Sequence, residues 1–159
     1  MNANFELKYK WILWFHKVND NNWGLDSYSK IYEIKTYHDL LFIMKSIDNI
    51  TSGMFFFMKE GINPVYEDEN NINGGYWSLR VSKKDSFDYW EKILYYLAVD
   101  KLTENKDDLI NGVSVSPKIN NCIFKIWNSN FSKINNEHLR KDLNFIKFDE
   151  LFYLQHKAD

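Results

Sequence analysis

INGVSVSPKINNCIFKIWN, residues 110–128, predicts two strands joined by a short polar turn. Residues 112–116 and 123–128 are rich in β-branched and apolar side chains, and Pro117 and an Asn-Asn pair between them are turn formers. A connection this short joins antiparallel strands, because parallel strands need a long crossover. The segment therefore favours an antiparallel sheet, although strands and helices alternate along much of the chain.

Periodicity outside this hairpin predicts the rest of the fold. Leu40, Ile43, Met44 and Ile47 recur at helical spacing behind Thr36, a good N-terminal cap. Ser86 is expected to cap a second helix in the same way. The elements expected are strands at residues 10–18, 28–34, 54–61, 75–81 and 148–155, and helices at 36–50, 86–99 and 136–143. The prediction is an α+β fold with one domain over residues 1–159: a curved, mostly antiparallel sheet of about eight strands with three helices packed on its convex face.

Composition narrows the classes of function. Net charge is −2 and the pI is about 6.1, so general binding of polyanions is not expected. Aromatic residues make up 18% of the chain, enough to supply both a core and binding surfaces. A single cysteine, Cys122, excludes an internal disulfide and fits a reducing compartment. No apolar run approaches the ~20 residues of a membrane span and no signal peptide is visible, so we expect a cytoplasmic protein.

The sequence contains no recognisable motif for catalysis, cofactor binding or metal binding. The four histidines are scattered, with no metal-binding spacing, and Gly74-Gly75 reads as a turn pair and not as a phosphate loop. Cys122 has no histidine nearby in sequence and is expected to be a small apolar strand residue. We therefore expect a protein that is not an enzyme, with no cofactor and no metal ion.

The loop NPVYEDENNINGGYW, residues 63–77, presents Tyr66 directly beside Glu67. Such a pair belongs either to an ordinary solvated hairpin or to a site for a flat ligand that carries N–H donors. A cationic purine such as N7-methylguanine suits the second interpretation. Two aromatic faces would stack on its charged ring, a carboxylate would accept its N1–H and N2–H₂ groups, and lysine or arginine would meet its phosphates.

Five motifs in order resemble the eukaryotic translation initiation factor 4E family, which binds the 5′ cap of mRNA. They are KWILWFHK, NNWGLDS, KEGINPVYEDENNINGGYW, SFDYWEKILYYLAVD and the opening segment INGVSVSPKINNCIFKIWN, and the chain ends in QHKAD. The resemblance covers nearly the whole chain and implies a cap cleft on the concave side of the sheet. The Asn-, Lys-, Ile- and Tyr-rich composition is typical of an AT-rich genome, which would suit a divergent viral or protist member.

The resemblance assigns a role to several residues of the cleft. Trp23 and Tyr66 match the two rings that stack on the cap base, with Tyr66 in place of the family's usual tryptophan. Glu67 matches the carboxylate that reads guanine, and Trp127 matches the tryptophan beside the N7-methyl group. The alternatives are a partly buried loop ring for Trp23, sheet packing for Tyr66, and a core position for Trp127. The other tryptophans, Trp11, Trp14, Trp77 and Trp90, are assigned to the fold.

The positions that bind phosphate depart from the family pattern. Lys118 stands for an arginine, which keeps the charge but loses the bidentate geometry. Ile123 and Tyr76 occupy positions that are usually basic. Because alternate residues of a strand share one face, Lys125 can replace the missing charge beside Ile123, or it can simply be solvated.

The family also implies a partner surface on the convex side, where a scaffold or repressor helix docks. Here the residues differ: Leu41 replaces an exposed tryptophan, and Glu91 replaces a leucine. The positions expected to form the patch are Tyr37, Leu41, Glu91 and Tyr95, with a plain solvated helix face as the alternative. The expected function is cap binding in translation initiation by a monomer, and the alternative is a cap-sequestering repressor that does not recruit the usual scaffold.

Overall fold

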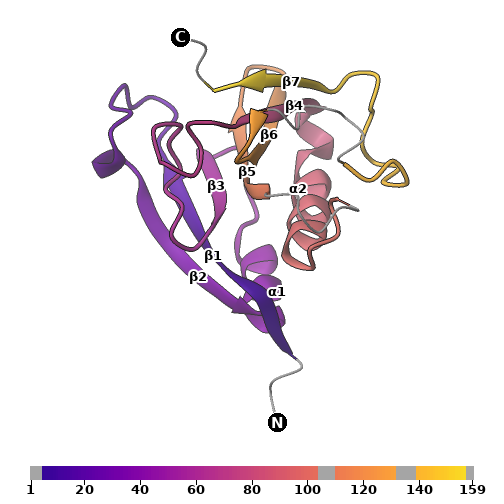
Figure 1. Cartoon of the computed structure of the whole chain (residues 1–159), viewed down its shortest axis with the longest axis horizontal. Helices are drawn as coiled ribbons and strands as arrows, with labels where there is room; N and C mark the ends of the chain where they lie inside the picture. The colour runs from indigo at the N-terminus through magenta and orange to yellow at the C-terminus, as the bar shows by residue number, and fades with distance from the viewer. Residues whose placement is uncertain (1–4, 104–109, 132–138, 157–159) are drawn as a thin grey trace.

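The computed structural model describes residues 5–103, 110–131 and 139–156. Within them, seven strands form one antiparallel sheet in the order β2-β1-β3-β5-β6-β4-β7 (Figure 1). The strands are β1 (Glu6–His16), β2 (Ser29–Thr36), β3 (Met54–Lys59), β4 (Gly75–Ser82), β5 (Ile110–Pro117), β6 (Asn121–Asn128) and β7 (Phe152–Gln155). The helices are α1 (Tyr37–Ser46) and α2 (Lys83–Ala98), with a short 3₁₀ turn at Leu25–Ser27.

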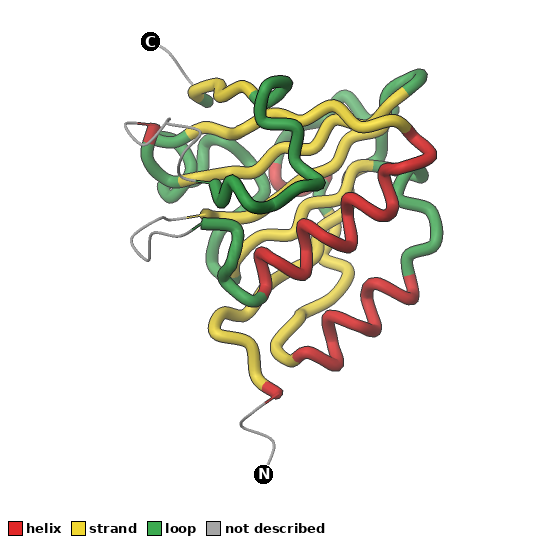
Figure 2. Tube along the Cα trace, turned by 90° about the vertical axis from the view of Figure 1, so that its right-hand side faces the viewer, coloured by secondary structure: helices red, strands yellow, loops and turns green. Residues whose placement is uncertain are grey.

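Both α-helices lie against the same face of the sheet (Figure 2). The main core lies between the helices and the sheet and is rich in large aromatic rings. Trp11, Trp77 and Trp90 are almost fully buried there, as predicted. A smaller cluster on the opposite face contains Trp14, which is also buried. The side chains of β1 alternate between these two clusters, because successive residues of a strand point to opposite faces.

The predicted hairpin is confirmed, since β5 and β6 pair antiparallel with Val113 opposite Ile126 and Pro117 opposite Cys122. Register shifts interrupt the pairing of β1 with β2, and such irregularities bend a sheet. Gly74 has a structural role beyond a turn, because a Cβ atom there would lie 1.9 Å from the carbonyl oxygen of Asn128. The α+β class and the curved antiparallel sheet are therefore as expected.

The first helix begins where the sequence predicts. The Thr36 hydroxyl accepts a hydrogen bond from Asp39 N at 3.1 Å, and Asp39 Oδ2 accepts one from Thr36 N at 3.0 Å. This reciprocal arrangement is a capping box. The cap predicted for the second helix is wrong, since α2 begins at Lys83, after Ser82. Ser86 lies within its first turns, where its hydroxyl donates to Ser82 O at 2.7 Å.

Three further expectations need correction. The structure has seven strands and two α-helices in its described part, and not about eight and three. Of the helix expected at residues 136–143, residues 136–138 lie outside the described residues. The remainder is not helical, because Leu139 forms a β-bridge with Thr103 and Arg140 N donates to Leu102 O. The last strand is also shorter than expected, since residues 148–150 form a turn before β7.

No helix in the described part of the chain is long and apolar enough to cross a membrane. Among the same residues, no group of three or more His, Cys, Asp or Glu side chains is arranged to hold a metal ion. Cys122 is buried, as expected for a small apolar strand residue.

Candidate functional site

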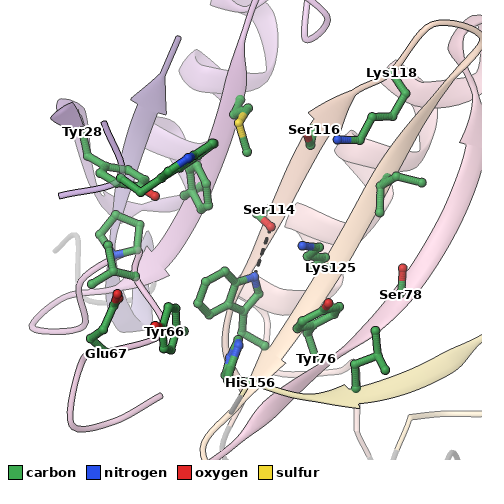
Figure 3. Close-up of a pocket in the computed structure, with 18 of the residues that line it drawn as sticks. Tyr28, Tyr66, Glu67, Tyr76, Ser78, Ser114, Ser116, Lys118, Lys125 and His156 are labelled. Atoms are coloured by element: carbon green, nitrogen blue, oxygen red, sulfur yellow. Dashed lines mark hydrogen bonds between the residues drawn. The ribbon is translucent and has the colours of Figure 1, made fainter. Parts of the chain in front are cut away.

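A cavity of about 660 Å³ opens on the face of the sheet away from the helices (Figure 3). Its walls come from the segment before β2, from β3, from the loop before β4, and from β4, β5, β6 and β7. The size suits a nucleotide or another small ligand. All six residues predicted to bind the cap base and phosphates line it: Trp23, Tyr66, Glu67, Trp127, Lys118 and Lys125.

The Trp23 indole is a half-exposed ring that rests on a buried histidine. It stacks on His16 with ring centroids 4.4 Å apart and planes only 7° apart, while 51% of the residue stays exposed. His16 is itself held in place, because its Nε2 lies 2.8 Å from Asn22 O. The imidazole therefore supports one face of the indole and leaves the other face available for a flat ligand.

The loop that carries Tyr66 and Glu67 is fixed by its neighbours. Asp68 accepts hydrogen bonds from Asn63 N at 2.9 Å and from Asn70 N at 2.8 Å. Asn71 is fully buried and donates to Asn63 O and Val65 O. Asp68 is thus a support of the loop.

Tyr66 and Glu67 themselves project from this fixed loop. Tyr66 is 42% exposed, so its ring is not buried in the sheet. Glu67 is exposed and makes no hydrogen bond or ion pair within the described residues. Its charge acts on a second residue that lines the cavity, because burial and the Glu67 carboxylate together raise the pKa of Tyr28 to about 12. An unpaired carboxylate at the mouth of the cavity is free to accept N–H groups of a ligand.

Trp127 is a buried ring that also lines the cavity. Its side chain is 6% exposed and packs in the smaller apolar cluster, with Phe56 at 6.3 Å between ring centroids. Its Nε1 donates to Ser114 Oγ at 3.1 Å, which fixes the orientation of the indole (Figure 3). The ring still lines the cavity, so a core residue presents one edge to the ligand space.

The two predicted cationic residues lie on one wall. Lys125 Nζ lies 4.5 Å from the centroid of the Tyr76 ring, and Lys118 lies at the turn between β5 and β6. Burial and the nearby Lys118 charge lower the pKa of Lys125. Ile123 also lines the cavity between them, where the resemblance leads one to expect a cation. A polyphosphate on this wall would relieve the repulsion between the two lysines.

The structure adds residues that the sequence analysis missed. His156 packs 4.6 Å from Trp127 and 5.5 Å from Tyr76, measured between ring centroids. Burial, with a smaller effect of Lys125, lowers the pKa of His156 to about 4, so its ring is neutral at pH 7. Tyr28 was missed as well. No local pattern marks either residue, because each reaches the cavity only through the pairing of strands distant in sequence.

The predicted partner residues lie on the helices, on the other side of the sheet from the cavity. Leu41 and Tyr95 are 52% and 51% exposed, while Tyr37 and Glu91 are partly buried. Lys92, next to Glu91, pairs with Asp88 at 2.9 Å. The four residues are therefore accessible from solvent, but the geometry alone assigns no partner to them.

The fold is similar to that of several solved structures. The chain superposes on the C. elegans eIF4E-3 in a complex with the 4E-binding protein Mextli and a cap analog, with a TM-score of 0.79, 23% identity, and coverage of 96% of this chain and 92% of that one. It also matches Ascaris suum eIF4E-3, solved in a complex with m7G cap, with a TM-score of 0.78 and 22% identity over 98% of this chain and 93% of that chain. At these identities the likeness shows the fold class, a curved antiparallel sheet with helices on one face.

Sequence comparison identifies the family. The family model described as eukaryotic initiation factor 4E matches residues 6–159, and the chain belongs to this family. A eukaryotic translation initiation factor 4E homolog of Acanthamoeba polyphaga mimivirus is 27% identical over 139 residues, which span 72% of this chain and 51% of that protein. Initiation factor NCBP of Arabidopsis thaliana is 42% identical over 76 residues, which span 48% of this chain and 34% of that protein. The chain thus spans about half of the length of the first relative and about a third of the second.

Proposed function

We propose that this protein binds the 7-methylguanosine 5′ cap of mRNA and acts in translation initiation. The observation that carries the proposal is that Trp23, Tyr66, Glu67, Trp127, Lys118 and Lys125 line one cavity, although they come from distant segments. Membership of the initiation factor 4E family supports it. So do the names of the relatives, which are initiation factors, and the solved neighbours that hold a cap.

In the proposed complex, the methylated base enters between the Trp23 and Tyr66 rings. Stacking on aromatic faces contributes about 1–3 kcal/mol per base, and the delocalised positive charge of 7-methylguanine adds cation–π attraction. Glu67 accepts the N1–H and N2–H₂ groups of guanine, since a carboxylate presents two acceptor oxygens side by side. The N7-methyl group lies against Trp127.

The triphosphate lies along the wall formed by Lys118 and Lys125. His156 lies against Trp127, close to the proposed position of the base. Its neutral state favours binding, because an imidazolium beside the cationic base would oppose it. The role is binding and not catalysis, and no cofactor is required. We take residues 1–159 as one cap-binding domain that acts as a monomer in the cytoplasm, where initiation takes place.

Recruitment of other proteins would use the helical face. We propose that a partner helix docks on Tyr37, Leu41, Glu91 and Tyr95, supported by the exposure of Leu41 and Tyr95. The C. elegans neighbour was solved with a 4E-binding protein. The initiation-factor names of the relatives favour this role over the cap-sequestering alternative.

Tryptophan fluorescence quenching tests the proposal directly, because Trp23 and Trp127 line the cavity. We expect strong quenching by 7-methyl-GTP and weak quenching by GTP in the wild type. Glu67→Gln should weaken 7-methyl-GTP binding at least tenfold, as expected when a charged hydrogen-bond acceptor is lost. Glu69→Gln, an exposed acid two residues along the same loop, is the matched control and should bind normally.

Three results would each contradict a different part of the proposal. Equal quenching by the two nucleotides would mean that the site does not select the methylated base. Absence of quenching by either would overturn cap binding altogether. Equal affinity of wild type and Glu67→Gln would remove Glu67 from the recognition of guanine.

A further inference from the structure

A buried side chain of β5 reaches the loop that carries Tyr66 and Glu67. Asn111 is only 3% exposed, and its Nδ2 donates hydrogen bonds to Asn70 O and to Asn71 Oδ1, each at 2.8 Å. A side-chain amide nitrogen carries two N–H groups, so both donors of Asn111 are used in these two bonds. Asn70 and Asn71 precede Asn111 by 41 and 40 residues, so β5 holds the loop from a distant part of the chain.

The position of Asn111 depends on a bulge in β5. Ile110 and Gly112 pair with successive residues of β6, so Asn111 between them is an extra residue in its strand. Val113 faces the main core, and regular alternation would direct Asn111, two residues earlier, into the same apolar layer. The bulge gives that place to Ile110 instead and directs the Asn111 amide to the loop. Bulges that redirect a side chain in this way occur often beside functional sites.

Asn111 sets the orientation of the Asn71 amide. Asn71 is fully buried, and its Nδ2 donates to Asn63 O at 3.0 Å and to Val65 O at 2.9 Å. The amide nitrogen therefore faces two carbonyl oxygens, while the amide oxygen faces the Asn111 donor. Exchange of the two ends would leave buried donors facing a donor and buried acceptors facing an acceptor, which is costly away from water.

The bond from Asn71 to Val65 O acts on the turn that presents the proposed cap-binding side chains. Asp68 N donates to the same carbonyl oxygen at 3.3 Å, so Tyr66 and Glu67 are the two central residues of a four-residue turn. Val65, Tyr66 and Glu67 all line the cavity. The orientation of this turn toward the cavity therefore depends on Asn71 and, through it, on the β5 bulge.

We propose that Asn111 is a positioning residue for the cap site, which holds the turn of Tyr66 and Glu67 in the geometry that receives the base. The turn carries both a stacking ring and the carboxylate, so a small displacement weakens two interactions at once. A turn that is ordered before the ligand arrives loses little freedom on binding, and this raises the affinity. The inference rests on the proposed cap-binding function and adds a residue that acts through Asn71 and not through contact with the ligand.

Affinity for 7-methyl-GTP in single and combined variants tests this role. Asn111→Ala should weaken binding about tenfold, as expected when about one residue of the turn has to be ordered on binding. In a Glu67→Gln background the same change should weaken binding about threefold or less, because the carboxylate that Asn111 positions is already altered. In a Lys118→Gln background, which alters the phosphate wall, it should keep its full effect.

Amide hydrogen exchange in the free protein gives a readout that needs no ligand. The Asp68 N–H group, which closes the turn, should exchange about tenfold faster in Asn111→Ala, because the turn opens more often. Asn111→Ser keeps one donor; it should show the same pattern with smaller changes, and it replaces the alanine variant if that protein does not fold. Ser86→Ala is the control for stability, since it removes a buried bond to Ser82 O on the helical side. It should leave 7-methyl-GTP affinity and Asp68 exchange unchanged.

The possible results separate this inference from the proposed function. Binding of 7-methyl-GTP by the wild type, with equal affinity of Asn111→Ala, would overturn the positioning role alone. An equal loss in the Glu67→Gln and Lys118→Gln backgrounds would make Asn111 a general support of the fold, which also contradicts the inference. Absence of 7-methyl-GTP binding by the wild type would overturn the proposed function, and the role of Asn111 with it.

Discussion

Acidification should destabilise this protein through His156. In the folded chain the pKa of this imidazole is about 4, mainly because burial disfavours the charged ring and partly because Lys125 is near. In the unfolded chain the ordinary value of 6.5 applies. Between these two values the unfolded state binds more protons than the folded state. Stability is therefore fully present above pH 6.5 and is lost as the pH falls to about 4.

The size of the effect follows from the same two values. A fall in pKa from 6.5 to about 4 corresponds to about 3 kcal/mol, at 1.36 kcal/mol for each pH unit. The ring is only partly buried, and solvent reduces the cost of charging it. We therefore expect this histidine to account for a loss of about 1–2 kcal/mol in the free energy of unfolding between pH 7 and pH 4.

Urea unfolding at several pH values measures this loss in the wild type and in His156→Gln. Carboxylates also titrate near pH 4, so the informative quantity is the difference between the two proteins at each pH. The variant should lose about 1–2 kcal/mol less stability than the wild type between pH 7 and pH 4. His38→Gln, at an exposed position of α1, should follow the wild type. Parallel pH profiles for wild type and His156→Gln would refute the argument.

Four further predictions follow from the site and from the helical face. Tyr66→Ala should weaken 7-methyl-GTP binding by about 1–3 kcal/mol in a fluorescence titration, because one stacking face is lost. Ile123→Lys should strengthen 7-methyl-GTP binding by about 1 kcal/mol and steepen its salt dependence, while binding of 7-methylguanosine, which has no phosphate, stays unchanged. Ser114→Ala should lower the free energy of unfolding by about 1–3 kcal/mol in urea, because it leaves the buried Trp127 Nε1 without its acceptor. Leu41→Asp should abolish capture of the scaffold protein in a pull-down and leave cap affinity unchanged, and capture that persists would exclude this patch.

Local patterns predicted the elements whose determinants are close in sequence. The first helix has its capping box within four residues, from Thr36 to Asp39, and the β5–β6 hairpin has its turn between its own strands. The cap of the second helix was misplaced, because Ser82 and Ser86 are both suitable residues and local sequence does not choose between them. The helix expected at residues 136–143 fails in its described part, since contacts with Leu102 and Thr103 satisfy that backbone.

The residues of the candidate site also fall into two groups, those that the sequence predicts and those that only the folded structure brings together. The sequence by itself determined which chemical groups are present: aromatic rings, one carboxylate beside a tyrosine, and lysines at strand spacing. Only the tertiary structure decided that His16 supports Trp23 and that His156 packs on Trp127. The physical reason is that side-chain alternation and capping act over a few residues, whereas strand pairing joins segments far apart in the chain. That pairing also sets the burial that holds the pKa of His156 low.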